Sequence, residues 1–401
     1  MRQQYYGIDL LRIFACFLVL LLHSCECFYV TFFCGVGSYL NLDVVALKSG
    51  CNYPTVDTVT VQSEAISVVL FESLTRCAVP IFVMISGFLL LPLKSCMTMG
   101  AFYRKRVSRI LLPLVSWTIV YSLYTTFLLE SGHDGVGDYL YSIFKGIGGV
   151  FVNFPNHFGH LWYVYMILGL YIIIPILSPW VERASRPQMI FVLSIWILTL
   201  FLPFIRSVCT NVWGECPWNP FGTHYYFSGF IGYLLLGAYI RKFIFDADFN
   251  CQKWGVLFVS IGFMSAVGLI IYQVSQINSF DAEESYMSIA KTFDMSLSYC
   301  SVPMFLQATG FFLLCFKLPS QRMPSILLDI SHLSYGIYLC HMIFLTLLCE
   351  NVFISLDLPT SIRIIGICLS TMLVSYLLTK ILSRLPYMMT KKRSELSFRP
   401  L

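Results

Sequence analysis

The first apolar stretch of the chain decides its fold. From Ile8 to Tyr29 it reads IDLLRIFACFLVLLLHSCECFY, and a helix of ~20 such residues crosses the ~30 Å of hydrocarbon in a bilayer. It begins like a signal peptide, but it carries charges and has no small-residue cleavage site, so we expect it to be retained. Nine similar stretches follow, at Ile66 to Leu91, Ile110 to Leu129, Leu161 to Leu177, Met189 to Ile205, Tyr226 to Phe245, Trp254 to Val274, Met295 to Phe316, Leu333 to Phe353 and Ile362 to Leu382.

The composition of the chain indicates the same solvent. Of its 401 residues, 57% are hydrophobic and 12% are charged, and the mean hydropathy is +0.75. Soluble domains carry about 25% charged residues. The stretches are continuously apolar, whereas the strands of a membrane barrel alternate over about ten residues. The sequence therefore predicts an all-α integral membrane protein, a bundle of about ten transmembrane helices.

The distribution of positive charge predicts the orientation of this bundle. Nineteen of the 26 Lys and Arg residues fall in one set of alternate loops, and five fall in the other set. Positively charged loops stay in the cytoplasm, so both termini are predicted to be cytoplasmic. The net charge of +5 then reflects the orientation of the chain in membrane lipid, and we expect no nucleic-acid partner. We expect a single transmembrane domain over residues 1–390 and a short basic cytoplasmic tail over residues 391–401.

The fifteen cysteines are scattered and lack metal-ligand spacing, so no metal site is predicted. Cys209 and Cys216 share an outside loop, where they form either a disulfide or two free thiols. The segment from Tyr139 to Phe158 is rich in aromatic residues and glycine, which favours an interfacial or re-entrant piece.

Ionisable side chains in the first stretch define the strongest candidate site. Arg12 and His23 are eleven positions apart, which is close to three helical turns, or about 16 Å along one face. Asp9 lies three residues before Arg12, and Glu26 lies three residues after His23, so each can form a pair on that face. Charges inside a membrane are costly unless they pair or face water, so this stripe is predicted to point inward.

A histidine beside a carboxylate suits general-base catalysis. Its pKa lies near neutrality, and the carboxylate can fix its tautomer, so His23 could deprotonate a hydroxyl. The alternative interpretation is that His23 is only hydrogen-bonded inside the bundle.

Arginines after the second stretch form a second candidate site. Arg106 and Arg109 are three apart at a helix start, and arginine forks match phosphate geometry, so the pair could hold the phosphates of a nucleotide-bearing cofactor. The alternative is that they only obey the positive-inside rule.

Three further groups of residues are candidates, and each can also be explained by helix packing or anchoring. In the second stretch, Arg76 follows Glu72 by one turn and precedes Val79-Pro80 and Ser86-Gly87, where either helix packing or a ligand could use the loosened helix. At outer ends, amphipathic aromatics commonly anchor helices, but they can also stack on a sugar. The residues of this kind are His160, Trp162 and Tyr163, where the fourth stretch opens. A separate polar stripe recurs at three- and four-residue steps in the ninth stretch, and its histidine is either a core residue or a site residue. The stripe consists of Ser331, Ser334, Tyr335, Tyr338 and His341.

Taken together, these segments resemble the acyltransferase 3 family of membrane O-acyltransferases, which modify sugars on bacterial surface polysaccharides and related acceptors. The similarity covers nearly the whole chain, and the order of the motifs is more specific than any one of them. The residues that carry it are Ile8-Asp9-Leu10-Leu11-Arg12 with His23, Arg76 with Val79-Pro80 and Ile85-Ser86-Gly87-Phe88, Arg106 and Arg109 before Leu112-Pro113, His160-Leu161-Trp162-Tyr163, and Ser334-Tyr335-Gly336-Ile337-Tyr338-Leu339 with His341.

The resemblance implies roles for these residues. It implies that Arg12 and His23 form the family's Arg-x10-His catalytic motif, and that Arg106 and Arg109 form its RxxR motif, which serves an acyl-CoA donor. Acetyl-CoA is the donor expected from what is common in the family, with Arg76 as a further donor-binding residue. The implied acceptor is a hydroxyl of a cell-surface carbohydrate or glycolipid, and the implied location is a bacterial plasma (inner) membrane.

Two mechanisms and two other classes of protein remain open from the sequence. His23 acts either as a general base or as a carrier of the acyl group. Many relatives have an extracytoplasmic domain fused at the C-terminus, whereas this sequence stops after Arg399-Pro400-Leu401. This chain is therefore expected to complete transfer alone or to pass the acyl group to another protein. A transporter or flippase of an acyl donor or glycolipid could use the same charges as a proton relay. A scaffolding subunit would leave the phasing of Arg12 and His23 unexplained.

Overall fold

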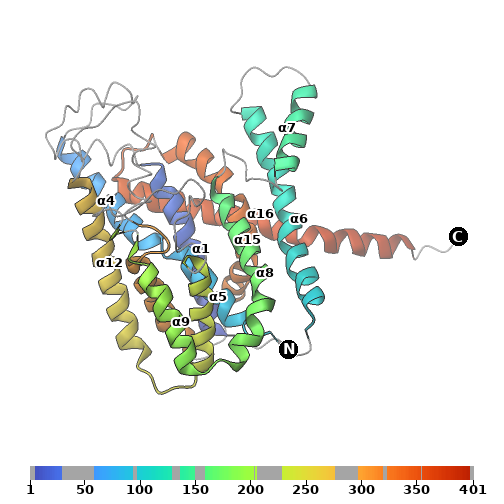
Figure 1. Ribbon diagram of the computed structural model, residues 1–401. Coiled ribbons are helices and arrows are strands. Elements are labelled where there is room, and N and C mark those ends of the chain that lie inside the picture. The colour runs from blue at the N-terminus through green and yellow to red at the C-terminus, as the bar shows by residue number, and fades with distance from the viewer. Residues whose placement is uncertain are drawn as a thin grey trace, which may run out of the picture.

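The structure, a computed structural model, consists only of helices and connecting segments in the part of the chain that it describes (Figure 1). It describes residues 5–28, 58–93, 97–128, 136–149, 159–202, 204–205, 228–275, 297–318, 323–353 and 355–397. The helices are α1 (Tyr6–Glu26), α4 (Thr58–Thr75), α5 (Ala78–Leu90), α6 (Met99–Leu128), α7 (Val136–Gly149), the short η1 (Gly159–Leu161), α8 (Trp162–Arg183), α9 (Arg186–Thr199), α11 (Phe230–Tyr239), the π-helical turn η3 (Ile240–Ile244), α12 (Cys251–Ser275), α14 (Val302–Phe316), α15 (Ser325–Leu348), the π-helical turn η5 (Cys349–Phe353) and α16 (Thr360–Ser397).

Helices occupy all ten stretches that the sequence predicts as spans. Seven helical segments are long and apolar enough to cross a membrane: Tyr6–Glu26, Ile66–Leu90, Met99–Tyr124, Gly159–Arg183, Cys251–Tyr272, Ser325–Phe353 and Thr360–Arg384. The other three stretches contain shorter helices, which are α9, α14 and α11 with η3. The predicted all-α membrane bundle is therefore confirmed, although three of its ten predicted spans are short. Helix α16 continues without a break past residue 390, where the predicted tail begins.

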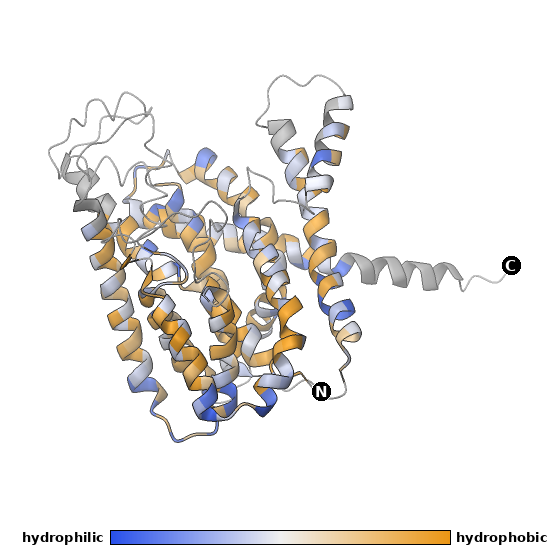
Figure 2. Ribbon diagram, viewed as in Figure 1, coloured by the Kyte–Doolittle hydropathy of each residue, from blue (hydrophilic) through white to orange (hydrophobic). Residues whose placement is uncertain are grey.

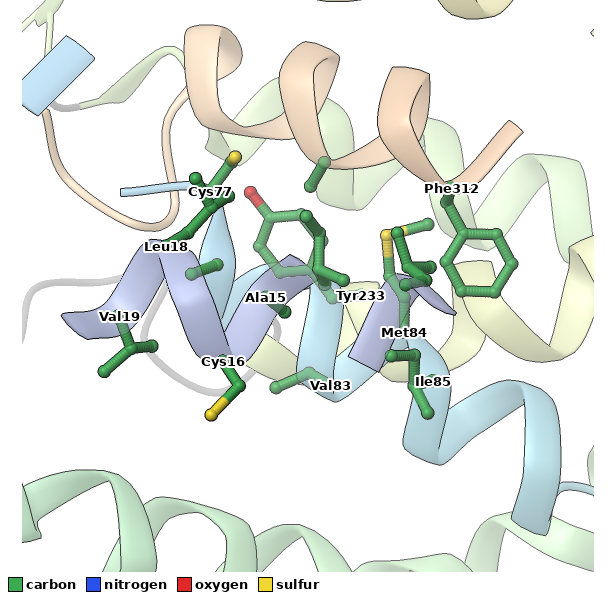
Figure 3. Packing of buried hydrophobic residues seen from close by; sticks show 14 of the residues in the cluster. Ala15, Cys16, Leu18, Val19, Cys77, Val83, Met84, Ile85, Tyr233 and Phe312 are labelled. Atoms are coloured by element: carbon green, nitrogen blue, oxygen red, sulfur yellow. The ribbon is translucent and has the colours of Figure 1, made fainter. Parts of the chain in front are cut away.

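Helix α1 lies inside the bundle. Buried residues make up 67% of its apolar window and 72% of the Ile66–Leu90 window, against 22–39% in the other five spans, so these two segments form the interior. Figure 3 shows why: Ala15 and Leu18 of α1 belong to a buried apolar cluster that also contains Met84 of α5, Tyr233 of α11 and Phe312 of α14. A polar residue on α1 therefore faces protein rather than lipid.

The second predicted span is broken into two helices. Helix α4 ends at Thr75 and α5 begins at Ala78, so Arg76 and Cys77 form the break. Pro80 lies in the first turn of α5, where its missing N–H has no helical partner to lose. The predicted loosening around this proline is thus a helix break four residues before it.

Close contact between α5 and α11 depends on two glycines. A Cβ at Gly87 would lie 1.9 Å from the carbonyl oxygen of Leu234, and a Cβ at Gly237 would lie 2.1 Å from the carbonyl oxygen of Met84. Each glycine therefore lies against the backbone of the opposite helix, as small residues allow in membrane helices. At Gly87 the structure shows helix packing, one of the two readings left open by the sequence.

Hydrophilic residues gather at the end of the bundle where the N-terminus lies (Figure 2). There the Lys242 ammonium donates to the carbonyls of Val181, Glu182 and Ala184 at 2.8 Å each, and Arg241 donates to the Phe88 carbonyl at 2.9 Å. These cations satisfy carbonyls at the C-terminal ends of α8 and α5. Loops that the charge rule places in the cytoplasm therefore lie together.

Candidate active site

The polar stripe of α1 faces α15. Nη1 of Arg12 lies 2.8 Å from Oδ1 of Asp9 and donates to the Ser331 hydroxyl at 3.0 Å. The same hydroxyl donates to Oδ1 of Asp9 at 2.8 Å, so the three side chains form a closed triangle. Such pairing offsets the cost of holding charge inside a membrane. One turn further along α15, Ser334 donates to the Ser331 carbonyl rather than to α1.

Near the other end of α1, His23 and Glu26 form the predicted pair. Nδ1 of His23 lies 2.7 Å from Oε2 of Glu26. An ionised carboxylate only accepts hydrogen bonds, so Nδ1 carries the proton. In the neutral ring the lone pair is then on Nε2, and the described residues offer no hydrogen bond to that atom. This is the tautomer that a general base needs.

Two histidines from other helices surround His23. Its ring centroid lies 5.2 Å from that of His341 on α15 and 6.3 Å from that of His160 in η1. The rings of His160 and His341 are themselves 5.2 Å apart. The three imidazoles form a cluster, which we call the histidine cluster. Both His160 and His341 are buried.

Two tyrosines hold the histidine cluster in place. The Tyr121 hydroxyl donates to the Leu339 carbonyl at 2.7 Å, so it accepts from Nε2 of His160 at 3.3 Å. The Tyr338 hydroxyl donates to the His160 carbonyl. These contacts join α6, η1 and α15, because Tyr121 lies on α6 and Tyr338 on α15. His160 is therefore held by contacts from both α6 and α15.

Arg76 lies in the break between α4 and α5 and is almost fully buried. Its Nε is 3.2 Å from Oε2 of Glu72, which is completely buried. Its guanidinium lies 5.7 Å from the ring centroid of Tyr299 and also interacts electrostatically with Glu26. A chain of charged and polar side chains thus runs from Glu72 through Arg76 and Glu26 to His23. This placement joins Arg76 to the histidine side of the molecule.

The remaining aromatic candidates are spread along α8 and α15. The ring centroid of Trp162 lies 5.3 Å from that of Tyr299. The ring centroid of Tyr163 lies 5.3 Å from that of Tyr338, next to the histidine cluster. Tyr335 instead donates its hydroxyl to the Ile110 carbonyl of α6 at 3.0 Å. The structure therefore brings Tyr163 to the cluster and ties Tyr335 to a neighbouring helix.

The predicted phosphate-binding arginines lie far from the histidine cluster. Arg106 and Arg109 are on the first turns of α6, where Arg106 is half-buried and Arg109 is exposed. Arg109 precedes Tyr121 by twelve residues, which is about 18 Å along the helix. One helix thus carries both the basic pair and a residue that contacts the cluster.

Several features of the site are not readable in the sequence. Tyr121 and Tyr299 look like ordinary aromatic residues of apolar stretches, and only their partners on other helices distinguish them. Among the residues described here, no group of three or more His, Cys, Asp or Glu is arranged to hold a metal ion. Cys209 and Cys216 lie outside the described residues, so their pairing stays a prediction.

These features define a polytopic membrane protein with an imidazole and carboxylate pair enclosed between helices. The chain belongs to the acyltransferase 3 family, whose acyltransferase domain model matches residues 5–380. It is 26% identical over 286 residues to YfiQ of Bacillus subtilis (strain 168), which is named as a membrane-bound acyltransferase; the alignment covers 69% of this chain and 70% of that protein. No solved structure matches the chain. The protein is thus a membrane-bound acyltransferase.

Proposed function

We propose that the protein transfers an acyl group, in the first place acetyl, from acyl-CoA to a hydroxyl of a cell-surface carbohydrate or glycolipid. The observation that carries the proposal is the 2.7 Å contact between Nδ1 of His23 and Glu26, which leaves the Nε2 lone pair available for a proton. Family membership supplies the acyl transfer itself. The choice of a hydroxyl as nucleophile follows from this lone pair, which suits removal of a proton from an alcohol.

The proposed reaction has one proton transfer in each direction. Nε2 of His23 removes the proton of the acceptor hydroxyl as its oxygen attacks the thioester carbonyl. The ester bond forms, the carbon–sulfur bond breaks, and the imidazolium returns the proton to the departing thiolate. Glu26 stabilises the imidazolium that exists between these steps.

The donor is proposed to enter along α6. Arg106 and Arg109 would hold the phosphates of CoA at the cytoplasmic end, since guanidinium groups bind phosphate in a bidentate manner. The pantetheine arm is a long flexible chain, which suits the distance of about 18 Å along α6 between Arg109 and Tyr121. Arg12 lies about 16 Å along α1 from His23, too far to stabilise an oxyanion there, so we assign it to orienting the donor or the helix pair.

The test replaces His23 with alanine in a strain that depends on this gene for acylation. We expect ester groups on the surface glycans, measured by mass spectrometry, to form about 10²-fold to 10⁴-fold more slowly, because general-base catalysis contributes that much. His332→Ala is the matched control, since His332 is an exposed histidine on α15.

Two outcomes would contradict the proposal. A His23→Ala protein that inserts normally and acylates its acceptor at the full rate would show that His23 is not the general base. Uptake of an acyl donor or glycolipid that continues without any acyl transfer would favour the transporter.

A further inference from the structure

A second histidine lone pair lies next to that of His23. Nδ1 of His341 is 2.5 Å from the carbonyl oxygen of Tyr338. A carbonyl only accepts hydrogen bonds, so Nδ1 of His341 carries the proton and Nε2 carries the lone pair. That Nε2 atom is fully buried and has no hydrogen-bond partner among the described residues.

A buried acceptor without a donor is unusual in a folded protein. Leaving it unpaired is unfavourable, and such groups gather where a ligand or an ordered water completes the hydrogen bonding. The ring of His23, whose Nε2 also carries a lone pair, is the neighbour of this atom on α1, with its centroid 5.2 Å from that of His341.

The two rings are spaced for two neighbouring hydroxyl groups. Their centroids are 5.2 Å apart, and their planes differ by 35°. Each hydrogen bond to a hydroxyl spans about 2.8 Å, so a ligand with two adjacent hydroxyls can donate one to each ring. A ligand with one hydroxyl satisfies His23 and leaves Nε2 of His341 without a donor.

We propose that His341 is a specificity-determining residue whose Nε2 accepts a hydrogen bond from a second hydroxyl, so that the preferred acceptor is a 1,2-diol such as neighbouring ring hydroxyls of a sugar. This inference rests on the proposed function, because His23 must act on the first hydroxyl. It goes beyond that function in naming the feature of the acceptor that is recognised. The ring of His160, with its centroid 5.2 Å from that of His341, and the Tyr338 carbonyl, which accepts from Nδ1 of His341, position His341 without taking part in the proton transfer.

A divalent metal ion is the other ligand that could satisfy imidazole lone pairs. Histidine ligands of zinc usually donate their second ring N–H to a carboxylate or carbonyl, as His23 and His341 do here. The ligand atoms of the described residues do not converge on a metal position, however. A diol fits the separated lone pairs better, and metal binding becomes an outcome of the test.

The experiment uses the full-length protein in lipid nanodiscs with labelled acetyl-CoA and two probe acceptors. The probes are trans-1,2-cyclohexanediol and cyclohexanol, and the ester products are measured by mass spectrometry. We expect the wild-type kcat/KM to favour the diol by about ten-fold or more, because a site built for a hydroxyl rejects an analogue that lacks it. His341→Leu should bring the ratio close to one by loss of the diol reaction, while the cyclohexanol reaction continues.

Two further variants separate recognition from folding. His341→Gln places an amide near the position of Nε2 and should restore most of the preference for the diol. His332→Leu changes an exposed histidine of the same helix and should behave as the wild type.

Three results would overturn the inference. They are equal wild-type rates for the two probes, an unchanged ratio in His341→Leu, and a stoichiometric divalent metal in the purified protein that His341→Leu loses. His23→Ala, measured on the natural surface glycan, tests the proposed function separately, so failure of this inference is distinguishable from failure of the proposed function.

Discussion

At the scale of single residues, the site is built from pairs of side chains, and each pairing offsets the cost of burying a charge. The membrane makes an unpaired charge expensive, so Asp9, Arg12, Glu72, Arg76 and Glu26 all lie within reach of an opposite charge or a hydrogen-bond partner. Glu26 differs from the others because its partner is an imidazole, which gains a proton in the reaction that we propose. Glu26 is therefore expected to contribute more to the rate of acyl transfer than to the stability of the fold.

Glu26→Gln tests this reading. The amide keeps the size of the side chain but removes the charge that stabilises the His23 imidazolium, so we expect kcat to fall about 10²-fold with little change in melting temperature. The measurement is acyl transfer by protein in nanodiscs, beside a thermal unfolding curve. Glu350→Gln, an exposed carboxylate in η5, serves as control. Equal losses of activity and stability in Glu26→Gln would assign Glu26 to folding alone.

The pairs within α1 follow from sequence, whereas the pairs between helices do not. A spacing of three residues places Asp9 beside Arg12 and His23 beside Glu26 on any α-helix. The approach of His341 to His23 depends on how α1 and α15 are rotated against each other. No spacing along the chain encodes that rotation.

At the scale of helices, glycine positions decide which pairs approach closely. Gly87 and Gly237 bring α5 and α11 together, and this contact supports the wall of α5 that faces α1. The helix break at Arg76 places a cation inside the bundle where a continuous helix would have continued its apolar face. The glycine contact sets the position of α5, against which α1 packs, and the helix break sets the position of the Arg76 ion pair.

Gly87→Ala is predicted to weaken the bundle. Its new Cβ would overlap the Leu234 carbonyl oxygen at 1.9 Å, and backbone cannot rotate away as a side chain can. We expect destabilisation of about 1–3 kcal/mol, the range found for overpacked cores, seen as a lower unfolding temperature in detergent. Gly169→Ala in α8, where nothing lies within 4 Å of a Cβ, should be neutral or slightly stabilising. Equal stability of the two variants would contradict the packing.

At the scale of the whole molecule, charge and burial divide the bundle along its length. The basic loops around Arg183, Arg186, Arg241 and Lys242 meet at one end, where Arg186 also contacts the Tyr239 hydroxyl at 3.3 Å. Under the charge rule this end is cytoplasmic. His23 lies seventeen residues, or about 25 Å, along α1 from Tyr6, so the histidine cluster lies toward the opposite side.

The orientation can be checked with reporter fusions in a bacterial host. Green fluorescent protein fused after Leu401 should fluoresce, and alkaline phosphatase fused there should be inactive, because both report a cytoplasmic C-terminus. Alkaline phosphatase fused after Glu130, in a loop predicted to be outside, should be active. The reverse pattern would place the histidine cluster toward the cytoplasm and would require a different route for the donor.

The sequence by itself determined the solvent of the fold, the positions of the helices and the pairs within α1, because hydropathy, periodicity and short spacings are local properties of one chain segment. Only the tertiary structure decided that α4 and α5 separate at Arg76, that Tyr121 supports His160, and that His341 lies beside His23. Those contacts join segments up to hundreds of residues apart, and they depend on how helices rotate and close against one another as they pack.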